Sequence, residues 1–230
     1  MTEGSTAVFV AEDLNVGYGS IPVVRGLNIA VHPGEIVALL GANGAGKSTT
    51  LLALAGELRP QSGSVAFAGD ASAGPLHERA KNGLGFVTEE RSVFMQLTVA
   101  ENLRLGRGDP SDAVDLMPEL KPLLKRRAGL LSGGEQQILT LARILASDCQ
   151  GLLIDEISLG LAPVVVQRLL AALRQAAREK NLAVVLVEQH VSSALEVSDR
   201  AMILRRGRVV LEGSSQDLAS RTEEVRAHYL

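Results

Sequence analysis

Aromatic residues and net charge are scarce in this sequence. It has no tryptophan, four phenylalanines and two tyrosines, too few for the stacking surface on which single-stranded nucleic acid binds. The formal net charge of −3 excludes the basic field that draws a protein to nucleic acid or to an anionic membrane surface. We therefore expect no nucleic-acid partner.

Disulfides and long apolar runs are also missing. Cys149 is the only cysteine, which rules out an intrachain disulfide and is typical of a reducing compartment. No run approaches the ~20 apolar residues that cross a bilayer, and the first residues lack the basic and apolar segments of a signal peptide. The sequence thus predicts a cytoplasmic protein that reaches a membrane only where another protein holds it.

The sequence does contain enough apolar residues for the core of one domain or of two tightly joined lobes. Hydrophobic residues make up 46% of the 230 residues. Short apolar runs alternate with segments of helical spacing, and three runs are candidates for buried strands: 35–40, 151–156 and 183–187. Because strands and helices alternate, we predict an α/β fold with a mainly parallel sheet.

The remaining patterns predict further strands and three helix faces. Residues 8–10, 27–31 and 62–69 are predicted strands, and 201–213 is a predicted hairpin. Pro163 fits the first turn of a helix. Three sets of residues have the spacing of one helix face: Leu51, Leu54, Ala55 and Leu58; Ile138, Leu141, Ala142 and Leu145; Val166, Leu169, Leu170 and Leu173.

Three prolines interrupt the pattern between about residues 90 and 130, namely Pro110, Pro118 and Pro122. We interpret this region as a separate, mostly helical lobe. The predicted organisation is a single domain over residues 1–230. In it, about 1–88 and 141–230 form the catalytic core lobe, and about 89–140 form the helical lobe.

The strongest motif is GANGAGKST at 41–49, which fits G-x-x-x-x-G-K-[ST] between a predicted strand and a predicted helix. Its glycines let consecutive N–H groups converge on a phosphate. Lys47 can reach the β- and γ-phosphates of a nucleotide, and the Ser48 hydroxyl can ligate Mg²⁺. The alternative is a glycine-rich turn with a solvated lysine. The other residues predicted at the nucleotide are Gly41, Ala42, Asn43, Gly44, Ala45, Gly46 and Thr49.

Two adjacent acids follow the second strand, in LLIDE at 152–156. Asp155 is predicted to hold the magnesium shell, and Glu156 to polarise a water for attack on the γ-phosphate. Two carboxylates at the end of an apolar strand are costly unless a cation compensates them. A pair of helix-capping acids is the alternative.

A second glycine-containing helix start lies in LLSGGEQQ at 130–137. Ser132 can cap the helix, with Glu135 completing a capping box. Gly133 and Gly134 each weaken a helix by roughly 1 kcal/mol relative to alanine, but they leave bare N–H groups at its positive end, a second anion site. Either the chain binds two nucleotides, or the second element serves a neighbouring copy.

The motifs GANGAGKST, LSGGEQQ and LLIDEISLGLAP, in this order along the chain, resemble the nucleotide-binding subunit of ABC transporters over nearly the whole chain. The resemblance implies a P-loop NTPase fold, with a RecA-like, mainly parallel core, an antiparallel β subdomain and a helical signature subdomain. It implies ATP and Mg²⁺ as cofactors and a head-to-tail homo- or heterodimer with a second ATPase subunit. In that dimer Ser132, Gly133, Gly134 and Glu135 would act in trans on the partner's ATP.

The resemblance also assigns two single residues. Tyr18 matches the aromatic position beside the adenine, with a surface turn tyrosine as the alternative. Glu89 stands where the family usually has glutamine in the loop that joins the sheet to the helical lobe. An oxygen of Glu89 can still join the metal shell.

Finer features resemble one branch of the family, the second ATPase subunit of importers for branched-chain amino acids and related amides or urea. They are EER at 89–91, SLGLAP at 158–163 and VEQ at 187–189; Ile157 departs from the usual proline. The resemblance implies transmembrane permease subunits, an external solute-binding protein and a place at the cytoplasmic face of the membrane. The alternatives are a soluble ABC ATPase of DNA repair or translation, and a P-loop kinase or GTPase.

The end of the last buried strand, VVLVEQHVSS at 184–193, raises a question of register. Most of the family has a histidine here that hydrogen-bonds the γ-phosphate. Aligning the strand places Gln189 at that position and His190 one residue later, where a side chain turns to the other face. We predict Gln189 as the catalytic residue; a slipped strand that brings in His190, and neither residue at the ATP, remain open.

Overall fold

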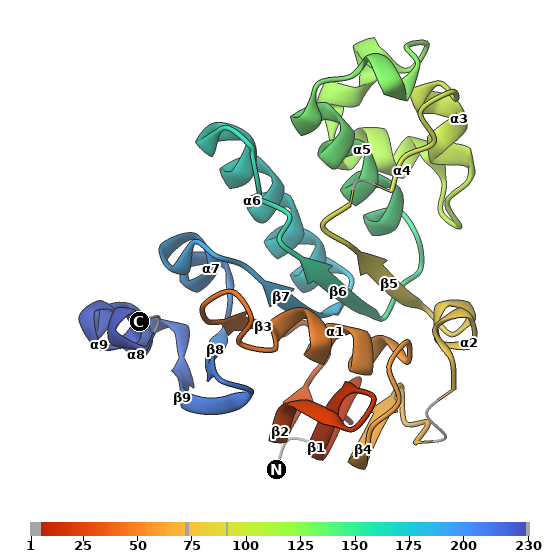
Figure 1. The fold of residues 1–230 in the computed structure, drawn as a ribbon. Coiled ribbons are helices and arrows are strands. Elements are labelled where there is room, and N and C mark those ends of the chain that lie inside the picture. The colour runs from red at the N-terminus through yellow and green to blue at the C-terminus, as the bar shows by residue number, and fades with distance from the viewer. Residues whose placement is uncertain (1–5, 72–73, 91, 229–230) are drawn as a thin grey trace, which may run out of the picture.

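The larger of two sheets forms the centre of the molecule (Figure 1). The computed structural model describes residues 6–71, 74–90 and 92–228. The strand order is β5-β6-β7-β3-β8-β9, parallel except for the antiparallel β8–β9 hairpin, which confirms the predicted mainly parallel sheet. The strands are β3 Ile36–Leu40, β5 Leu84–Val87, β6 Gly151–Asp155, β7 Ala183–Val187, β8 Arg200–Arg205 and β9 Arg208–Ser214.

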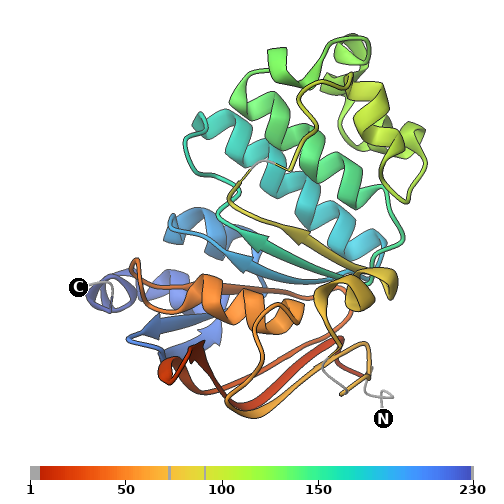
Figure 2. The same ribbon diagram turned by 45° about the vertical axis from the view of Figure 1, so that its right-hand side comes forward.

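The smaller sheet is antiparallel, in the order β2-β1-β4, and confirms the predicted β subdomain. Its strands are β1 Phe9–Tyr18, β2 Ile21–Val31 and β4 Ser62–Phe67. It packs below the larger sheet with helix α1 (Lys47–Ala55) (Figure 2). The rings of Phe9 and Phe67 lie 5.2 Å apart against the backbone of Gly151, where a Cβ would meet Phe67 at 2.6 Å.

Alternate residues of the central strands face two separate cores. Val184 and Leu186 pack with α5 (Gly133–Leu145) and α6 (Pro163–Glu179), whereas Val185 and Val187 pack with α1 and the smaller sheet. This alternation is the two-residue period of a strand buried on both faces. The edge of the sheet where β3, β6 and β7 end therefore lies between these two cores.

The three predicted helix faces are buried as expected, with one exception. Helix α1 ends at Ala55 because Gly56 adopts a left-handed conformation, with φ of 81°, and its N–H caps the last turn. Leu58 therefore lies beyond the helix, packed against the core only in part. Its predicted place on the helix face was wrong.

The helical lobe stands above the larger sheet (Figures 1 and 2). Pro110 and Pro118 begin helices there, since proline suits a first helical turn. Helix α5 runs from this lobe past residue 140, the predicted lobe boundary. The lobe comprises α3 Val99–Arg104, α4 Pro110–Leu116, the 3₁₀ turns Pro118–Leu123 and Ala128–Leu130, and the start of α5.

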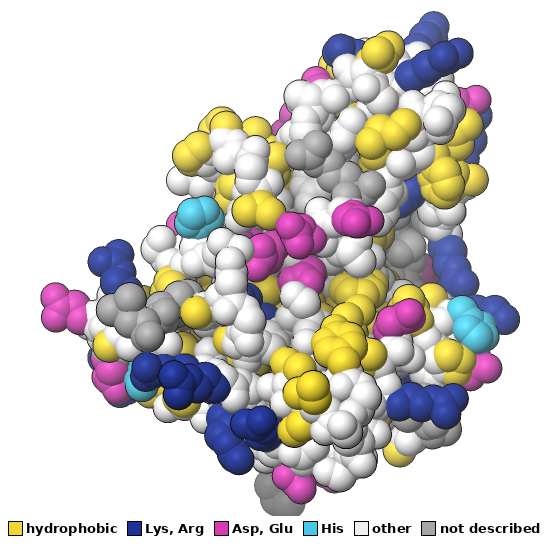
Figure 3. Space-filling view, viewed as in Figure 1, with side chains coloured by type: hydrophobic (Ala, Val, Ile, Leu, Met, Phe, Trp, Pro, Cys, Tyr) yellow, Lys and Arg dark blue, Asp and Glu magenta, His cyan; other side chains and the backbone are white. Residues whose placement is uncertain are grey.

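The remaining helices lie around the core. They are α2 Leu76–Lys81, α7 Val191–Val197, α8 Ser215–Ser220 and α9 Thr222–Ala227. Within the described ranges, every helix is too short or too polar to cross a bilayer. On the face shown in Figure 3, acidic side chains gather between the helical lobe and the core.

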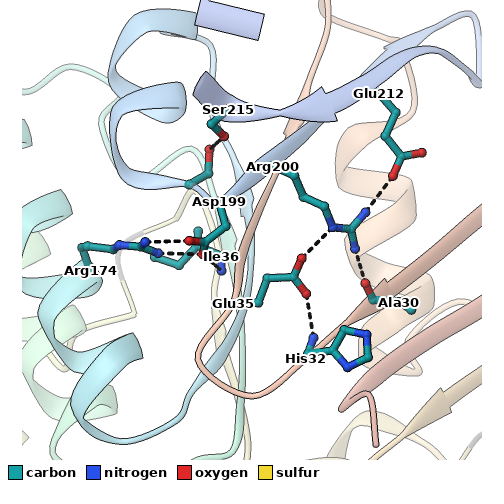
Figure 4. Close-up of polar contacts among 10 residues, drawn as sticks. Ala30, His32, Glu35, Ile36, Arg174, Asp199, Arg200, Glu212 and Ser215 are labelled. Atoms are coloured by element: carbon teal, nitrogen blue, oxygen red, sulfur yellow. Dashed lines mark hydrogen bonds and ion pairs between the residues drawn. The ribbon is translucent and has the colours of Figure 1, made fainter. Parts of the chain in front are cut away.

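A polar junction centred on Arg200 joins the two sheets (Figure 4). Its guanidinium donates to Glu35 at 2.6 Å, to Glu212 at 2.7 Å and to the carbonyl of Ala30 in β2. Beside it, Asp199 takes two hydrogen bonds of 2.6 Å from Arg174 and one of 2.8 Å from the N–H of Ile36.

Replacing Arg200 by methionine is expected to lower the free energy of unfolding by about 2 kcal/mol, because it strips the partly buried Glu35 of its cation. The matched control is Arg221→Met. Arg221 pairs with Asp217 and Glu224 on the surface, where ion pairs contribute little. Urea denaturation measures both; equal losses in the two variants would contradict this role of the junction.

Candidate functional site

The glycine-rich loop lies between β3 and α1, in the strand–turn–helix setting that its motif requires. Gly41, Gly44 and Gly46 have φ of 148°, 77° and 106°, values that L side chains rarely adopt. A Cβ on Gly41 would lie 2.3 Å from the carbonyl oxygen of Leu204. The loop can therefore adopt this turn only with glycine at these positions.

Lys47 is the first residue of α1, and its side chain is 5% exposed. The ammonium donates to the carbonyls of Gly41 at 2.9 Å and Ala42 at 3.2 Å. It lies 3.9 Å from a carboxylate oxygen of Glu156. Burial lowers the pKa of Lys47, while Glu156 and Asp155 oppose that shift. The result is a buried cation surrounded by oxygen atoms at the loop.

Asp155 ends β6 close to the side chain of Ser48. The pKa of Asp155 is raised, chiefly by burial and further by the charges of Glu156 and Glu89; Ser48 and Lys47 oppose the shift. Its Oδ1 atom is buried without a hydrogen-bond partner. A buried, unsatisfied carboxylate oxygen next to a hydroxyl fits a hard divalent cation such as Mg²⁺, which prefers oxygen ligands.

Glu156 has a left-handed backbone, with φ of 51°, and its N–H donates to the carbonyl of Val187 at 3.0 Å. Its side chain is 12% exposed and accepts a 2.7 Å hydrogen bond from the amide of Gln189. The same amide lies 3.4 Å from Asn43 of the loop. His190 is exposed at the start of α7. The structure thus brings Gln189, not His190, against Glu156.

The glycine-rich loop, Glu89, Glu156 and Gln189 line a cavity of about 560 Å³, within the acidic region of Figure 3, whereas Asp155 lies outside its lining. Its volume is in the range of ligand pockets. Val23 and Leu159 contribute apolar walls that the sequence motifs did not reveal. The lining consists of Val23, Asn43, Gly44, Gly46, Lys47, Ser48, Thr49, Glu89, Glu156, Leu159 and Gln189.

Tyr18 and the second glycine element lie outside this lining. Tyr18 is the last residue of β1, and 55% of its side chain is exposed. Ser132 is exposed at the start of α5, where it accepts from the N–H of Glu135 at 3.3 Å and donates its own N–H to the Glu135 carboxylate at 2.6 Å. The predicted capping box is present, and in the part of the chain that the structure describes Ser132 and Glu135 do not line the cavity beside the glycine-rich loop.

Glu188 is the residue whose place in the structure the sequence did not predict. It follows β7, is 1% exposed, and accepts from the N–H of Ser158 at 3.1 Å and from the Ser158 hydroxyl. Burial raises the pKa of Glu188, against the opposing effect of the Ser158 bonds. A carboxylate directly after five apolar residues was the signal available in the sequence. Arg91, the last residue of the EER segment, lies outside the described residues.

The sequence profile described as "ABC transporter" matches residues 24–158. The high-affinity branched-chain amino acid transport ATP-binding protein BraG of Pseudomonas aeruginosa is 41% identical, over 93% of this chain and 95% of that protein. A probable branched-chain amino acid transport ATP-binding protein, LivF of Archaeoglobus fulgidus, is 34% identical over 89% and 91%. The lipopolysaccharide export ATP-binding protein LptB of Acidithiobacillus ferridurans is 34% identical over 90% of each.

Solved structures share the fold. An ATP-binding subunit of an ABC transporter superposes with a TM-score of 0.82 at 26% identity, covering 96% of this chain and 98% of its own. A dimeric ATP-binding cassette in a post-hydrolysis state, with ADP and phosphate bound, gives a TM-score of 0.79 at 23% identity, over 90% and 98%. Because its identity is only 23%, the likeness to the cassette with ADP and phosphate shows a shared fold alone.

Proposed function

Because this chain belongs to the ABC transporter family, as one of its ATP-hydrolysing subunits, we propose that it powers the movement of a small solute through separate permease subunits. The observation that carries the proposal is the cavity in which the glycine-rich loop, Glu89, Glu156 and Gln189 meet. The solute we infer is a branched-chain amino acid or a related amide or urea. The chain would then act at the cytoplasmic face of the membrane.

In the proposed site, the loop N–H groups and Lys47 hold the phosphates of ATP. Ser48, Asp155 and Glu89 are the residues that would hold Mg²⁺, which when bound supplies charge neutralisation at the β- and γ-phosphates. The buried ammonium of Lys47 bonds to two loop carbonyls, so the loop backbone holds it in place. Tyr18 remains our candidate for stacking on the adenine.

Glu156 is the proposed general base, which polarises a water for in-line attack on the γ-phosphate. Its carboxylate lies 2.7 Å from the Gln189 amide and 3.9 Å from Lys47, so it is oriented from two sides. The Gln189 amide can also donate to a phosphate oxygen without titrating. Both residues would act on the same reacting group.

The second ATPase subunit is proposed to supply the other half of each site. Ser132, Gly133, Gly134 and Glu135 form a partly exposed helix start, in which the N–H groups of Gly133 and Gly134 can bind a phosphate. In a head-to-tail dimer, these residues would meet the ATP held by the partner's loop. The partner is either a second copy or a sister subunit.

The permease contact is proposed on the helical lobe, beside the loop that carries Glu89. Phe94, Met95 and Leu130 are 54%, 43% and 63% exposed, and the N–H of Gly129 donates to the Met95 carbonyl at 2.9 Å. Exposed apolar side chains brought together in this way suit an amphipathic cytoplasmic helix of a membrane subunit.

The inferred solute rests on the named relatives. BraG, at 41% identity, and LivF are both described as branched-chain amino acid transport proteins, whereas LptB, at 34%, is described as a lipopolysaccharide export protein. Import of an amino acid further implies an external solute-binding protein. Export of a lipid is the competing outcome.

Copurification tests the proposal. The tagged chain, isolated from membranes in mild detergent, is expected to bring down permease subunits and a second ATPase subunit, identified by mass spectrometry. Recovery of ribosomes or DNA-bound assemblies in their place would favour a soluble ABC ATPase and contradict the transport function.

Paired alanine substitutions after β7 test the proposed role of Gln189. Gln189→Ala is expected to lower ATP turnover by about 10²-fold, because Glu156 loses its 2.7 Å partner. His190→Ala serves as the neighbouring control and should retain near-normal turnover at pH 6 and pH 8. A severe loss in His190→Ala, with Gln189→Ala unaffected, would reverse the assignment.

A further inference from the structure

We propose that Glu188 is a positioning residue for ATP hydrolysis: its buried carboxylate fastens the turn after Glu156 to the end of β7 and so fixes Glu156 against Gln189. The inference rests on the roles proposed for Glu156 and Gln189. Glu188 itself does not line the cavity, so it would act through its neighbours.

Three links join two short segments, 156–158 and 187–189. The N–H of Glu156 donates to the carbonyl of Val187 at 3.0 Å. The N–H and hydroxyl of Ser158 both donate to the carboxylate of Glu188. The amide of Gln189 donates to the carboxylate of Glu156 at 2.7 Å. The first and third links hold Glu156 and Gln189. The second link, between Ser158 and Glu188, holds the turn that follows Glu156.

The link between Ser158 and Glu188 is the most deeply buried of the three. Glu188 is 1% exposed and Ser158 is 5% exposed. Ile157, which precedes Ser158, is 1% exposed in the apolar core. Among the described residues, no lysine or arginine forms an ion pair with Glu188. A buried carboxylate without a cation is costly, so fastening this turn for stability alone would be better served by a neutral side chain.

The backbone of Glu156 supplies a reason for that cost. Its φ of 51° is a strained value for a residue with a side chain, and such strain persists only where neighbouring contacts hold it. Two charge-assisted bonds to Ser158, two residues later, hold the chain in this turn. Without them the turn can relax, and a shift of the Glu156 carboxylate by about 1 Å is enough to slow a reaction by about 10²-fold.

Substitutions at Glu188 and Ser158, in the complex as purified from membranes, test the proposal. Glu188→Met keeps the volume but removes both acceptor oxygens, and it is expected to lower kcat at least ten-fold while KM for ATP and the affinity for a fluorescent ATP analogue change less than about three-fold. Glu188→Gln retains an acceptor for the Ser158 N–H and is expected to recover most of the lost turnover. Ser158→Ala, which loses one of the two bonds, should fall between them.

A matched control separates positioning from stability. Ser215 is 3% exposed and shares a 2.7 Å hydrogen bond with Ser198, far along the chain from the cavity. Ser215→Ala, which like Ser158→Ala loses one buried hydroxyl bond, is expected to leave turnover per ATP-binding site unchanged. Thermal unfolding is measured for every variant. Because kcat is counted per nucleotide-binding site, protein that has not folded does not lower the measured rate.

The double variant provides the decisive comparison. Glu188→Met with Ser158→Ala should be no slower than Glu188→Met alone, because both changes break the same link. Full turnover in the two single variants, Glu188→Met and Ser158→Ala, would overturn the inference, and so would additive losses in the double variant. In either case a loss of turnover in Glu156→Gln would leave the proposed function standing. Full turnover in Glu156→Gln would overturn the proposed base, and this inference with it.

Discussion

Replacing Glu156 by glutamine is expected to lower ATP turnover by about 10²- to 10³-fold, in the range that a positioned general base contributes. The substitution keeps the size of the side chain and can keep the hydrogen bond to Gln189. It removes the carboxylate that would take the proton of the attacking water. The glycine-rich loop and Lys47 are untouched, so ATP should still bind.

The experiment measures phosphate release in the assembled complex and equilibrium binding of ATP in parallel. Glu179→Gln is the matched control, since Glu179 is an exposed acid at the end of α6; its turnover should equal that of the unmodified chain. Turnover in Glu156→Gln within about three-fold of the unmodified rate would rule out Glu156 as the base.

Replacing Asp155 by asparagine is expected to have two opposite effects, a more stable nucleotide-free protein and an almost complete loss of magnesium-dependent hydrolysis. Burial is the largest cause of the raised pKa of Asp155, and Glu156 and Glu89 add to it. A carboxyl whose pKa is higher in the folded than in the unfolded chain costs stability above its unfolded pKa. The uncharged asparagine amide does not lower the stability in this way, but it is a poorer ligand for Mg²⁺ than the carboxylate.

Thermal unfolding without nucleotide checks the first effect. At neutral pH, Asp155→Asn should melt above the unmodified chain, and the difference should narrow as the pH falls through the raised pKa of Asp155. Phosphate release in excess Mg²⁺ checks the second, with a fall of about 10²-fold or more. Asp148→Asn, at an exposed acid before β6, is the control for both. A variant that melts below the unmodified chain at neutral pH would contradict the proposed cost of the buried charge.

Local patterns predicted the elements of this site because each depends on contiguous residues. The run 35–40, the glycines after it and the periodic residues from Leu51 specify a strand, a turn and a helix within residues 35–55. The position of Gln189 was predicted by aligning one strand end with the family's pattern. The structure places that side chain, not His190, against Glu156, and its role at the γ-phosphate stays a prediction.

Contacts between distant segments could not be read in this way. The bond between Glu188 and Ser158 spans 30 positions, and it depends on β6 and β7 being neighbours in register, with Asp155 opposite Val187. The walls formed by Val23 and Leu159 depend on the packing of a second sheet and of a turn. Leu58 fits a helical period, but Gly56 ends the helix first. Spacing alone does not specify where a helix stops.

The most direct test of the central claim is uptake of labelled leucine by membrane vesicles that contain this chain, its copurified partners and enclosed ATP, with the external solute-binding protein supplied outside. The account predicts uptake that requires ATP, with phosphate released as leucine accumulates, and the loss of both when the chain carries Glu156→Gln. Phosphate release at the full rate with no movement of leucine, isoleucine, valine, an amide or urea would contradict the claim that this ATPase powers transport of such a solute.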